Sequence, residues 1–498
     1  MRRKKNFFLL IALVCYIQVS ADVQIEWVRI YNGPGNSVDR TTSIAVDQGG
    51  SIYVTGYSWD SITSYDYATI KYATNGDTVW VRRYNGPGND WDMPTDLEVD
   101  GDGNVYVTGT SRGNGTQYDY ATIKYTPNGD TLWVRRYNGP LNFFDQANAL
   151  AVDSSGNVHV TGQSDGESFG EEYATIKYAS SGETLWVRRY NGGPGSSTDQ
   201  AYTLAVDKGG KVYVTGLSWG GASYDYATIK YTPNGDTLWV RRYNGPVNSS
   251  DFVNALAVDA GGNVYVTAQS ANTNLLDDYA TIKYAPNGDT LWVRRYNGSK
   301  NGSDRPKALG VDGLGNVYVT GYSEELGTSN DYTSIKYNPN GDAQWVRHYN
   351  KQGNGHDFAR ALAVDGNGNV YVAGGSGTIK YSANGDSLWF GSYGGWQIVL
   401  DSFENVYVIG GNGNDYLTVK YKQCEGWPGD ADGDGNLTFL DIVYQVNYVF
   451  KKGPTPVPFC SGDDDGDGQV NLKDIVYKIN HIIKDGPAPT ESGLCCLD

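Results

Sequence analysis

The feature that most constrains this chain is a strand-like segment that recurs at a fixed interval. The segment Trp-Val-Arg-Arg-Tyr, or a variant of it, begins at Trp27, Trp80, Trp133, Trp186, Trp239, Trp292, Trp345 and Trp389. The first six intervals are all 53 residues long. An array with so few insertions is built from one repeated supersecondary unit, and the units must stack or close on one another.

Each repeat contains four segments with the pattern of β-strands. In one repeat these are residues 97–100, 104–108, 120–125 and 131–137. β-Branched and aromatic residues dominate them, and Asn128-Gly129 between the last two is typical of a tight hairpin turn. Four antiparallel strands in a repeat of this length are typical of a propeller blade.

The two ends of the array predict a closed ring. The chain opens with an isolated fourth segment, residues 25–31, and closes with three segments that lack a fourth, residues 398–400, 405–408 and 417–421. Closure also protects the sheet edges that an open stack would expose. We therefore predict a mainly β fold, an eight-bladed β-propeller over residues 22–422. Seven blades is the alternative, because the last two repeats are shortened.

The repeated motifs resemble a known family. Leu-Ala-Val-Asp, Gly-Asn-Val-Tyr-Val-Thr-Gly and Tyr-Ala-Thr-Ile-Lys-Tyr, over residues 25–422, are similar to the bacterial SBBP-type β-propeller repeats, which are related to NHL repeats. The resemblance implies that the first strand of each blade lines a central channel. It implies no particular activity, because one propeller fold serves many functions.

The first 21 residues have the pattern of a signal peptide. A basic start, Arg2 to Lys5, precedes the apolar residues 7–17 and the small residues before a cleavage site ahead of Asp22. The apolar run is too short to cross a bilayer comfortably, so we expect a secreted protein with no membrane span. A net charge of −17 argues against nucleic acid as a partner.

Two acidic positions recur in the blades. One lies near the first strand, at Asp39, Asp92, Asp145, Asp199, Asp251, Asp304 and Asp357. The other opens the third strand, at Asp66, Asp119, Glu172, Asp225, Asp278, Asp331 and Asp415. Two acidic rings on one face would suit cations or a basic ligand. Strict repetition instead favours a structural role, in which each carboxylate caps a turn or bonds a neighbouring blade.

The loops vary more than the strands and carry aromatic residues. These are Trp59, Trp91, Trp219, Phe143, Phe144, Phe252 and Phe358. Exposed aromatics on a polar rim suit a carbohydrate or protein ligand, whereas the alternative is packing against adjoining blades. The chain shows none of the common catalytic motifs, and we expect a protein that is not an enzyme. Asp100 to Asn104 imitates a calcium loop, and we predict a hairpin turn there.

After Tyr421 the sequence changes character and contains two acidic loops. Residues 430–441 and 463–474 each place Asp at positions 1, 3, 5 and 12 and Gly at position 6, a spacing that wraps oxygens around one Ca²⁺. The predicted ligands of two calcium ions are Asp430, Asp432, Asp434, Asn436 and Asp441, and Asp463, Asp465, Asp467, Gln469 and Asp474. A helix is predicted after each loop, over residues 441–450 and 474–483.

Residues 424–486 resemble the type I dockerin domain in two features: neither loop has a preceding helix, and position 12 of each loop is Asp. The resemblance implies calcium-dependent binding to a cohesin-like module. The family's partner-reading positions fall on Phe439, Leu440, Leu472 and Lys473, where the family commonly has small hydroxyl residues. The four cysteines of the tail, Cys424, Cys460, Cys495 and Cys496, are expected to form two disulfides whose pairing stays open.

These patterns predict a signal peptide over residues 1–21, a propeller over 22–422 and a small helical, dockerin-like calcium-binding domain over 423–498. The leading hypothesis is a secreted binding or scaffold protein that docks onto an extracellular partner through its tail. Dockerins usually accompany polysaccharide-degrading enzymes, so a component or enzyme of extracellular polysaccharide degradation is the alternative. In a third hypothesis the tail packs against its own propeller.

Overall fold

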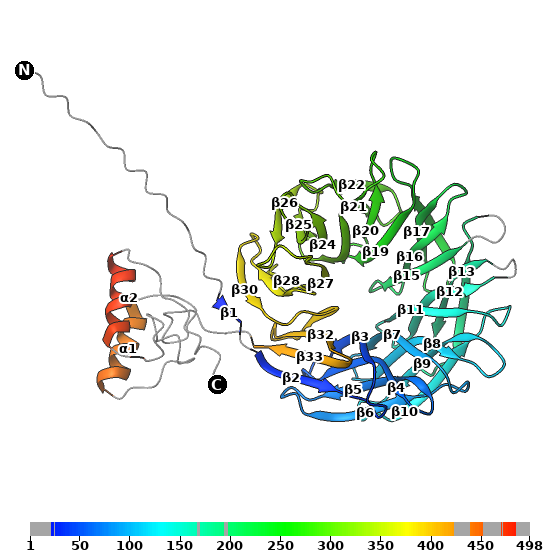
Figure 1. Ribbon diagram of the computed structural model, residues 1–498, viewed down its shortest axis with the longest axis horizontal. Coiled ribbons are helices and arrows are strands. Elements are labelled where there is room, and N and C mark those ends of the chain that lie inside the picture. Colours follow the sequence, from blue (N-terminus) through cyan, green and yellow to red (C-terminus); the bar gives the residue numbers. More distant parts are fainter. Residues whose placement is uncertain are drawn as a thin grey trace, which may run out of the picture.

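The repeats form separate four-stranded sheets that stand around a central channel (Figure 1). The computed structural model describes residues 21–23, 25–166, 170–193, 198–422, 439–451, 470 and 472–484. Eight sheets are found in these ranges, so the prediction of an eight-bladed propeller is confirmed and the seven-bladed alternative is wrong.

Blades 1 to 4 each consist of four consecutive strands. They are β3 (Asp39–Val46), β4 (Ile52–Asp60), β5 (Ser64–Tyr72) and β6 (Thr78–Tyr84); β7 (Asp92–Val99), β8 (Val105–Arg112), β9 (Tyr118–Tyr125) and β10 (Thr131–Tyr137); β11 (Asp145–Val152), β12 (Val158–Asp165), β13 (Glu171–Tyr178) and β14 (Thr184–Tyr190); and β15 (Asp199–Val206), β16 (Val212–Trp219), β17 (Tyr224–Tyr231) and β18 (Thr237–Tyr243).

Blades 5 to 8 repeat the plan, and the last of them joins the two ends of the array. They are β19 (Asp251–Val258), β20 (Val264–Ala271), β21 (Asp277–Tyr284) and β22 (Thr290–Tyr296); β23 (Arg305–Val311), β24 (Val317–Glu324), β25 (Asn330–Tyr337) and β26 (Ala343–Tyr349); β27 (Ala359–Val364), β28 (Val370–Gly374), β29 (Gly377–Tyr381) and β30 (Ser387–Gly391), with β1 (Ala21–Asp22); and β31 (Gln397–Leu400), β32 (Val406–Asn412), β33 (Asp415–Tyr421) and β2 (Ile25–Tyr31).

The strands of a blade pair antiparallel with their neighbours in sequence order, and the first strand is innermost. The last two predicted strands of blade 2 agree closely with β9 and β10. The first strand is longer than predicted, because β7 begins at Asp92. A β-bulge between Pro94 and Asp96 interrupts the alternation of inward and outward side chains, and the sequence pattern is lost there.

The ring closes through the N-terminal strand, as predicted. β2 pairs antiparallel with β33, with Ile25 opposite Tyr421 and Tyr31 opposite Tyr416. Blade 1 then contacts blade 8, where the Thr41 hydroxyl donates to the Gly410 carbonyl at 3.0 Å. The two residues of β1 add a fifth, parallel strand beside β30.

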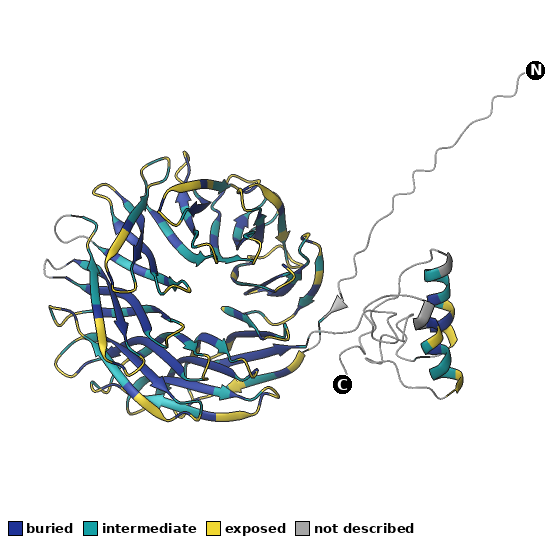
Figure 2. Cartoon of the chain, turned by 180° about the vertical axis from the view of Figure 1, so that it is seen from behind, coloured by how far each residue is buried: buried dark blue, intermediate teal, exposed yellow. Residues whose placement is uncertain are grey.

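The hydrophobic core lies between the blades, and exposed residues gather on outer strands and loops (Figure 2). At each junction a buried Trp of the outermost strand packs against apolar residues of the next blade, as Trp133 does with Val158 and Ile176. Its indole Nε1 donates to the Ser180 carbonyl at 3.1 Å, and Arg135 donates to the Gly182 carbonyl in the same turn. The repeated Trp-x-Arg therefore fastens every blade except blade 7 to the next; blade 7 has Trp389 but no arginine two residues later.

Two helices follow in the C-terminal region, α1 (Phe439–Lys451) and α2 (Leu472–Lys484). They cover the two segments that the sequence predicted to be helical, and they contact each other. Ile442 and Ile475 are buried. Over the described ranges, no helix combines the length and the apolar character needed to cross a bilayer.

Candidate functional site in the propeller channel

The first acidic ring is part of the scaffold. Asp92 is fully buried at the start of β7, and its carboxylate accepts the Gly86 amide at 2.5 Å and the Arg112 amide at 3.2 Å. The equivalent Asp takes the matching amide in every blade from 1 to 7. Burial raises the pKa of Asp92, Asp145 and Asp304 to about 6. These carboxylates hold turns, which supports the structural interpretation.

The second acidic ring is paired with arginine. Arg136 of β10 lies 2.8 Å from Asp119 and also donates to the hydroxyl of Tyr84, on the preceding blade, at 3.1 Å. The pair recurs in blades 1 to 5, as Arg83–Asp66, Arg136–Asp119, Arg189–Glu172, Arg242–Asp225 and Arg295–Asp278. In these blades the acid and its arginine connect strands and neighbouring blades.

Blade 6 departs from this pattern. His348 stands where blades 1 to 5 have arginine, and its Nδ1 lies 3.4 Å from Glu325 and 3.0 Å from the Thr333 hydroxyl. Asp331, the acid of this blade, is buried and accepts the Thr328 hydroxyl at 2.8 Å. Burial raises the pKa of Asp331.

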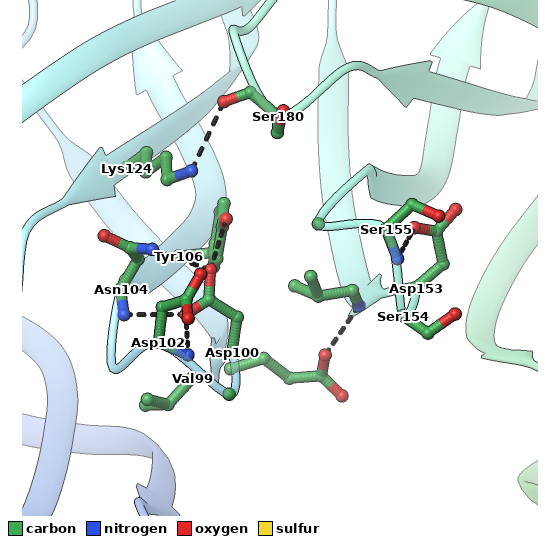
Figure 3. Close-up of a pocket in the computed structure, with 14 residues that line it drawn as sticks. Val99, Asp100, Asp102, Asn104, Tyr106, Lys124, Asp153, Ser154, Ser155 and Ser180 are labelled. Atoms are coloured by element: carbon green, nitrogen blue, oxygen red, sulfur yellow. Dashed lines mark hydrogen bonds between the residues drawn. The ribbon is translucent and has the colours of Figure 1, made fainter.

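A pocket of about 650 Å³ lies between blades 2 and 3 (Figure 3). Its wall includes Asp100, which accepts the Tyr106 hydroxyl at 2.8 Å and the Asn104 amide at 2.8 Å, so the predicted hairpin turn is confirmed. Lys124 closes one side by donating to the Ser180 carbonyl. A similar pocket of about 460 Å³ lies between blades 4 and 5, and we attribute both to the repeat itself.

The channel offers a cavity whose wall differs from blade to blade. It measures about 750 Å³ and is lined by first strands of blades 1, 2, 3, 7 and 8, as the family resemblance implied. Most of the lining residues are apolar, but polar atoms form the larger part of the surface that faces the cavity, and blade 2 contributes Asp96 and Glu98. Asp96 accepts the Ser43 hydroxyl at 3.0 Å and the Leu150 amide at 2.9 Å. Glu98 accepts the Val152 amide at 2.7 Å.

The pKa of each of these two carboxyls is raised, which favours the protonated form. Burial raises the pKa of Asp96 to about 6. Burial and, next, the neighbouring Asp96 raise the pKa of Glu98 to about 7. Near neutral pH the pair therefore combines ionised and protonated forms, and it can accept or donate hydrogen bonds at the channel wall.

Sequence reasoning missed Asp96 and Glu98, although the repeat carries the signal. The equivalent residues are Ser43 and Ala45 in blade 1 and Ala149 and Ala151 in blade 3. Because scaffold residues repeat, an acidic pair in a single blade marks a position with another role.

The predicted aromatic loop residues divide into two groups. Trp59 packs edge-on against Tyr65 at 5.0 Å between ring centroids, and Trp219 packs in the same way against Tyr224. Phe144 and Phe358 also contact tyrosine rings. Trp91 also packs edge-on against Tyr65, at 5.7 Å between ring centroids, but it and Phe143 keep 45% and 40% of their surface exposed.

Most predicted calcium ligands lie outside the described residues, together with the four tail cysteines. The described exception is Asp474, whose side chain is buried in the first turn of α2. Asp441, Phe439 and Leu440 lie in α1, where only the backbone is described. Leu472 and Lys473 are exposed at the start of α2. Within the described ranges, no three acidic, His or Cys side chains are grouped to hold a metal.

Comparison with known families finds the repeat that the sequence resembles. The model of the SBBP β-propeller repeat matches residues 26–62, 79–115, 132–170, 291–326 and 344–377. The chain therefore contains SBBP β-propeller repeats, and the predicted resemblance of this region is confirmed.

Other similarities concern the fold. An uncharacterized WD repeat-containing protein of Acanthamoeba polyphaga mimivirus is 26% identical over 40% of this chain, and the match spans only 18% of that relative. Two solved structures of Sqt1 from Chaetomium thermophilum each match 80% of this chain. One matches over 100% of its own length at 11% identity with a TM-score of 0.53, the other over 98% at 10% with 0.51.

Proposed function

We propose that this protein is a secreted binding or scaffold protein. The propeller would present a ligand site in and around its channel. The C-terminal region would bind two calcium ions and dock onto a cohesin-like extracellular partner.

The observation that carries the binding role is the channel cavity with its uneven wall. A cavity of about 750 Å³ has the size of small-molecule sites, which are mostly apolar with a few polar groups. Blade 2 supplies Asp96 and Glu98 to it where blade 3 has alanines. Two half-buried carboxyls with raised pKa are costly to keep in a scaffold, and such costs are usual at functional positions.

The calcium-dependent tail is supported by spacing and by its helices. The two loop patterns stand in equivalent positions relative to α1 and α2. Asp474, the last predicted ligand of the second loop, lies in the first turn of α2, where a carboxylate also interacts favourably with the helix dipole.

Calcium titration of the full-length chain after metal removal tests this part of the proposal. We expect about two ions to bind and the helical signal in circular dichroism to grow, because unneutralised loop carboxylates repel one another. A variant with Asp430→Asn and Asp463→Asn should lose this response.

Asp102→Asn is the matched control, because Asp102 belongs to the calcium-like turn between β7 and β8. It should titrate as the unmodified chain does. Equal titration by the double loop variant would overturn the calcium assignment.

Secretion is tested separately by expression with the natural leader in a bacterial host. We expect the protein outside the cytoplasm with Asp22 as its first residue. Retention of an intact leader in the cytoplasm would contradict this part of the proposal.

A further inference from the structure

In blades 1 to 7 the first strand has a bulge, which carries a side chain at the channel end near the loops between the second and third strands. In blades 1 to 5 the bulge residue is uncharged: Thr42, Thr95, Asn148, Tyr202 or Asn254. Thr95 and Asn148 each donate to a backbone carbonyl of the following blade, at 2.9 Å and 2.7 Å. At these junctions the bulge residue helps to fasten the ring.

Blades 6 and 7 place cations at this position. The bulge residues are Lys307 and Arg360, and among the described residues neither makes a hydrogen bond or an ion pair. The Lys307 ammonium lies 5.7 Å from the centre of the Tyr322 ring, and the Arg360 guanidinium lies 5.2 Å from that of Trp396. The side chains of Lys307 and Arg360 therefore do not make the hydrogen bond to the following blade that Thr95 and Asn148 make.

The surroundings leave positive charge uncompensated. Arg305, two residues before Lys307, is nearby and pairs with Asp277 at 2.9 Å. Burial, followed by Arg305 and Arg360, lowers the pKa of Lys307. Lys307, Arg305 and Arg360 are therefore three neighbouring cations, of which Arg305 is paired with the carboxylate of Asp277. They occur in a chain whose net charge is −17. A cluster of like charges costs stability, and a scaffold role does not account for it.

We propose that Lys307, Arg360 and Arg305 bind the carboxylate or other oxyanion of a small ligand at this end of the channel, with sugar acids as the ligand class. Ammonium and guanidinium groups bind oxyanions through charge-assisted hydrogen bonds. Trp396, 36% exposed and with the Arg360 guanidinium over its ring, supplies flat apolar surface for a ligand ring next to the anion. A long polyanion is disfavoured, because it would meet the acidic remainder of the molecule. This inference deepens the proposed binding role and depends on it.

Calorimetric titration of the full-length chain with galacturonate, sulfate, inorganic phosphate and glucose, at about 10 mM salt, tests the site. We expect the anions to bind and glucose not to bind. Lys307→Gln and Arg360→Gln should each weaken binding by about tenfold or more. Because Arg360 is exposed, its substitution should leave folding intact. Lys208→Gln, an exposed cation of the turn between β15 and β16, is the control for the charge change.

The ranking of the anions identifies the ligand. Tighter binding of galacturonate than of sulfate or phosphate supports sugar acids. Equal binding of all three anions would overturn the sugar-acid class, and no binding, or binding unchanged in both variants, would overturn the site. Failure here would leave the calcium titration of the tail unaffected, so the two proposals fail independently.

Discussion

At the scale of single residues, Glu98 is the clearest case of a side chain that lowers the free energy of unfolding once its carboxyl must ionise. Its carboxyl sits in the channel wall beside Asp96, and its pKa rises to about 7. Because this pKa lies above its value in an unfolded chain, about 4.3, the folded state holds the proton longer. The resulting stability is present below about pH 4 and is lost as the pH rises through about 7.

Glu98→Gln should therefore stabilise the protein at about pH 8, by roughly 1–2 kcal/mol after allowance for solvent in the channel. At about pH 4 the two proteins should differ little, because the carboxyl is protonated in both the folded and the unfolded chain. Urea unfolding at the two pH values measures this. A difference of the same size at both would contradict the raised pKa as its cause.

At the scale of elements, the junction between blades depends on the tryptophan of each outermost strand. Trp239 donates its Nε1 to the Pro286 carbonyl at 3.1 Å. Trp239→Phe should cost about 1 kcal/mol beyond the loss of ring area, because that carbonyl loses one of its two hydrogen bonds and keeps the other, from the Lys230 ammonium at 2.7 Å.

Trp389 is a matched control for this prediction. It is as buried as Trp239, but none of the described residues accepts a hydrogen bond from its Nε1. Trp389→Phe should therefore cost less than Trp239→Phe in the same denaturant titration. Equal losses would show that the hydrogen bond contributes nothing.

A substitution at the junction of blades 5 and 6 should increase the stability of the protein. His348→Arg should restore the pair with Asp331 and keep the contact with Tyr296, whose hydroxyl already lies 3.4 Å from His348 Nε2, raising the free energy of unfolding by about 1 kcal/mol at about pH 8. The reverse change in blade 5, Arg295→His, should lower it by about 1–3 kcal/mol, since it leaves Asp278 without its arginine. Thermal unfolding of both variants checks the prediction, and a loss in the first would contradict it.

At the scale of the whole molecule, the ring depends on β2. Removing residues 22–31 should abolish a single cooperative transition and promote aggregation, because β33 becomes an unpaired edge. Removal of residues 22–24 alone leaves β2 intact and should be tolerated. Calorimetry and size-exclusion chromatography compare the two. Cooperative unfolding of the shorter chain would show that closure by β2 is dispensable.

The closed ring could be predicted because the repeated strand segments, and the isolated segment at the start of the array, are visible in the sequence. Every Trp-Val-Arg-Arg-Tyr segment became an outermost strand, and the isolated segment 25–31 became β2. The sites were harder to predict, because the first strands carry bulges that hide which residues face the channel. Asp96, Glu98, Lys307 and Arg360 become evident only when blades are compared position by position. The spacing of the calcium loops, in contrast, predicts ligands without any knowledge of the surrounding fold.

The closure of blade 8 also sets an order in time. During synthesis β2 emerges first, and its partner β33 follows only after all the intervening blades have been made. Until β33 has been made, β2 has no partner strand. Unpaired strand edges of this kind are the surfaces through which incomplete chains aggregate. A pairing between residues so far apart is also slow to form. A chain that stops before β33 begins at Asp415 would contain seven complete blades and still lack the partner of β2 that closes the ring.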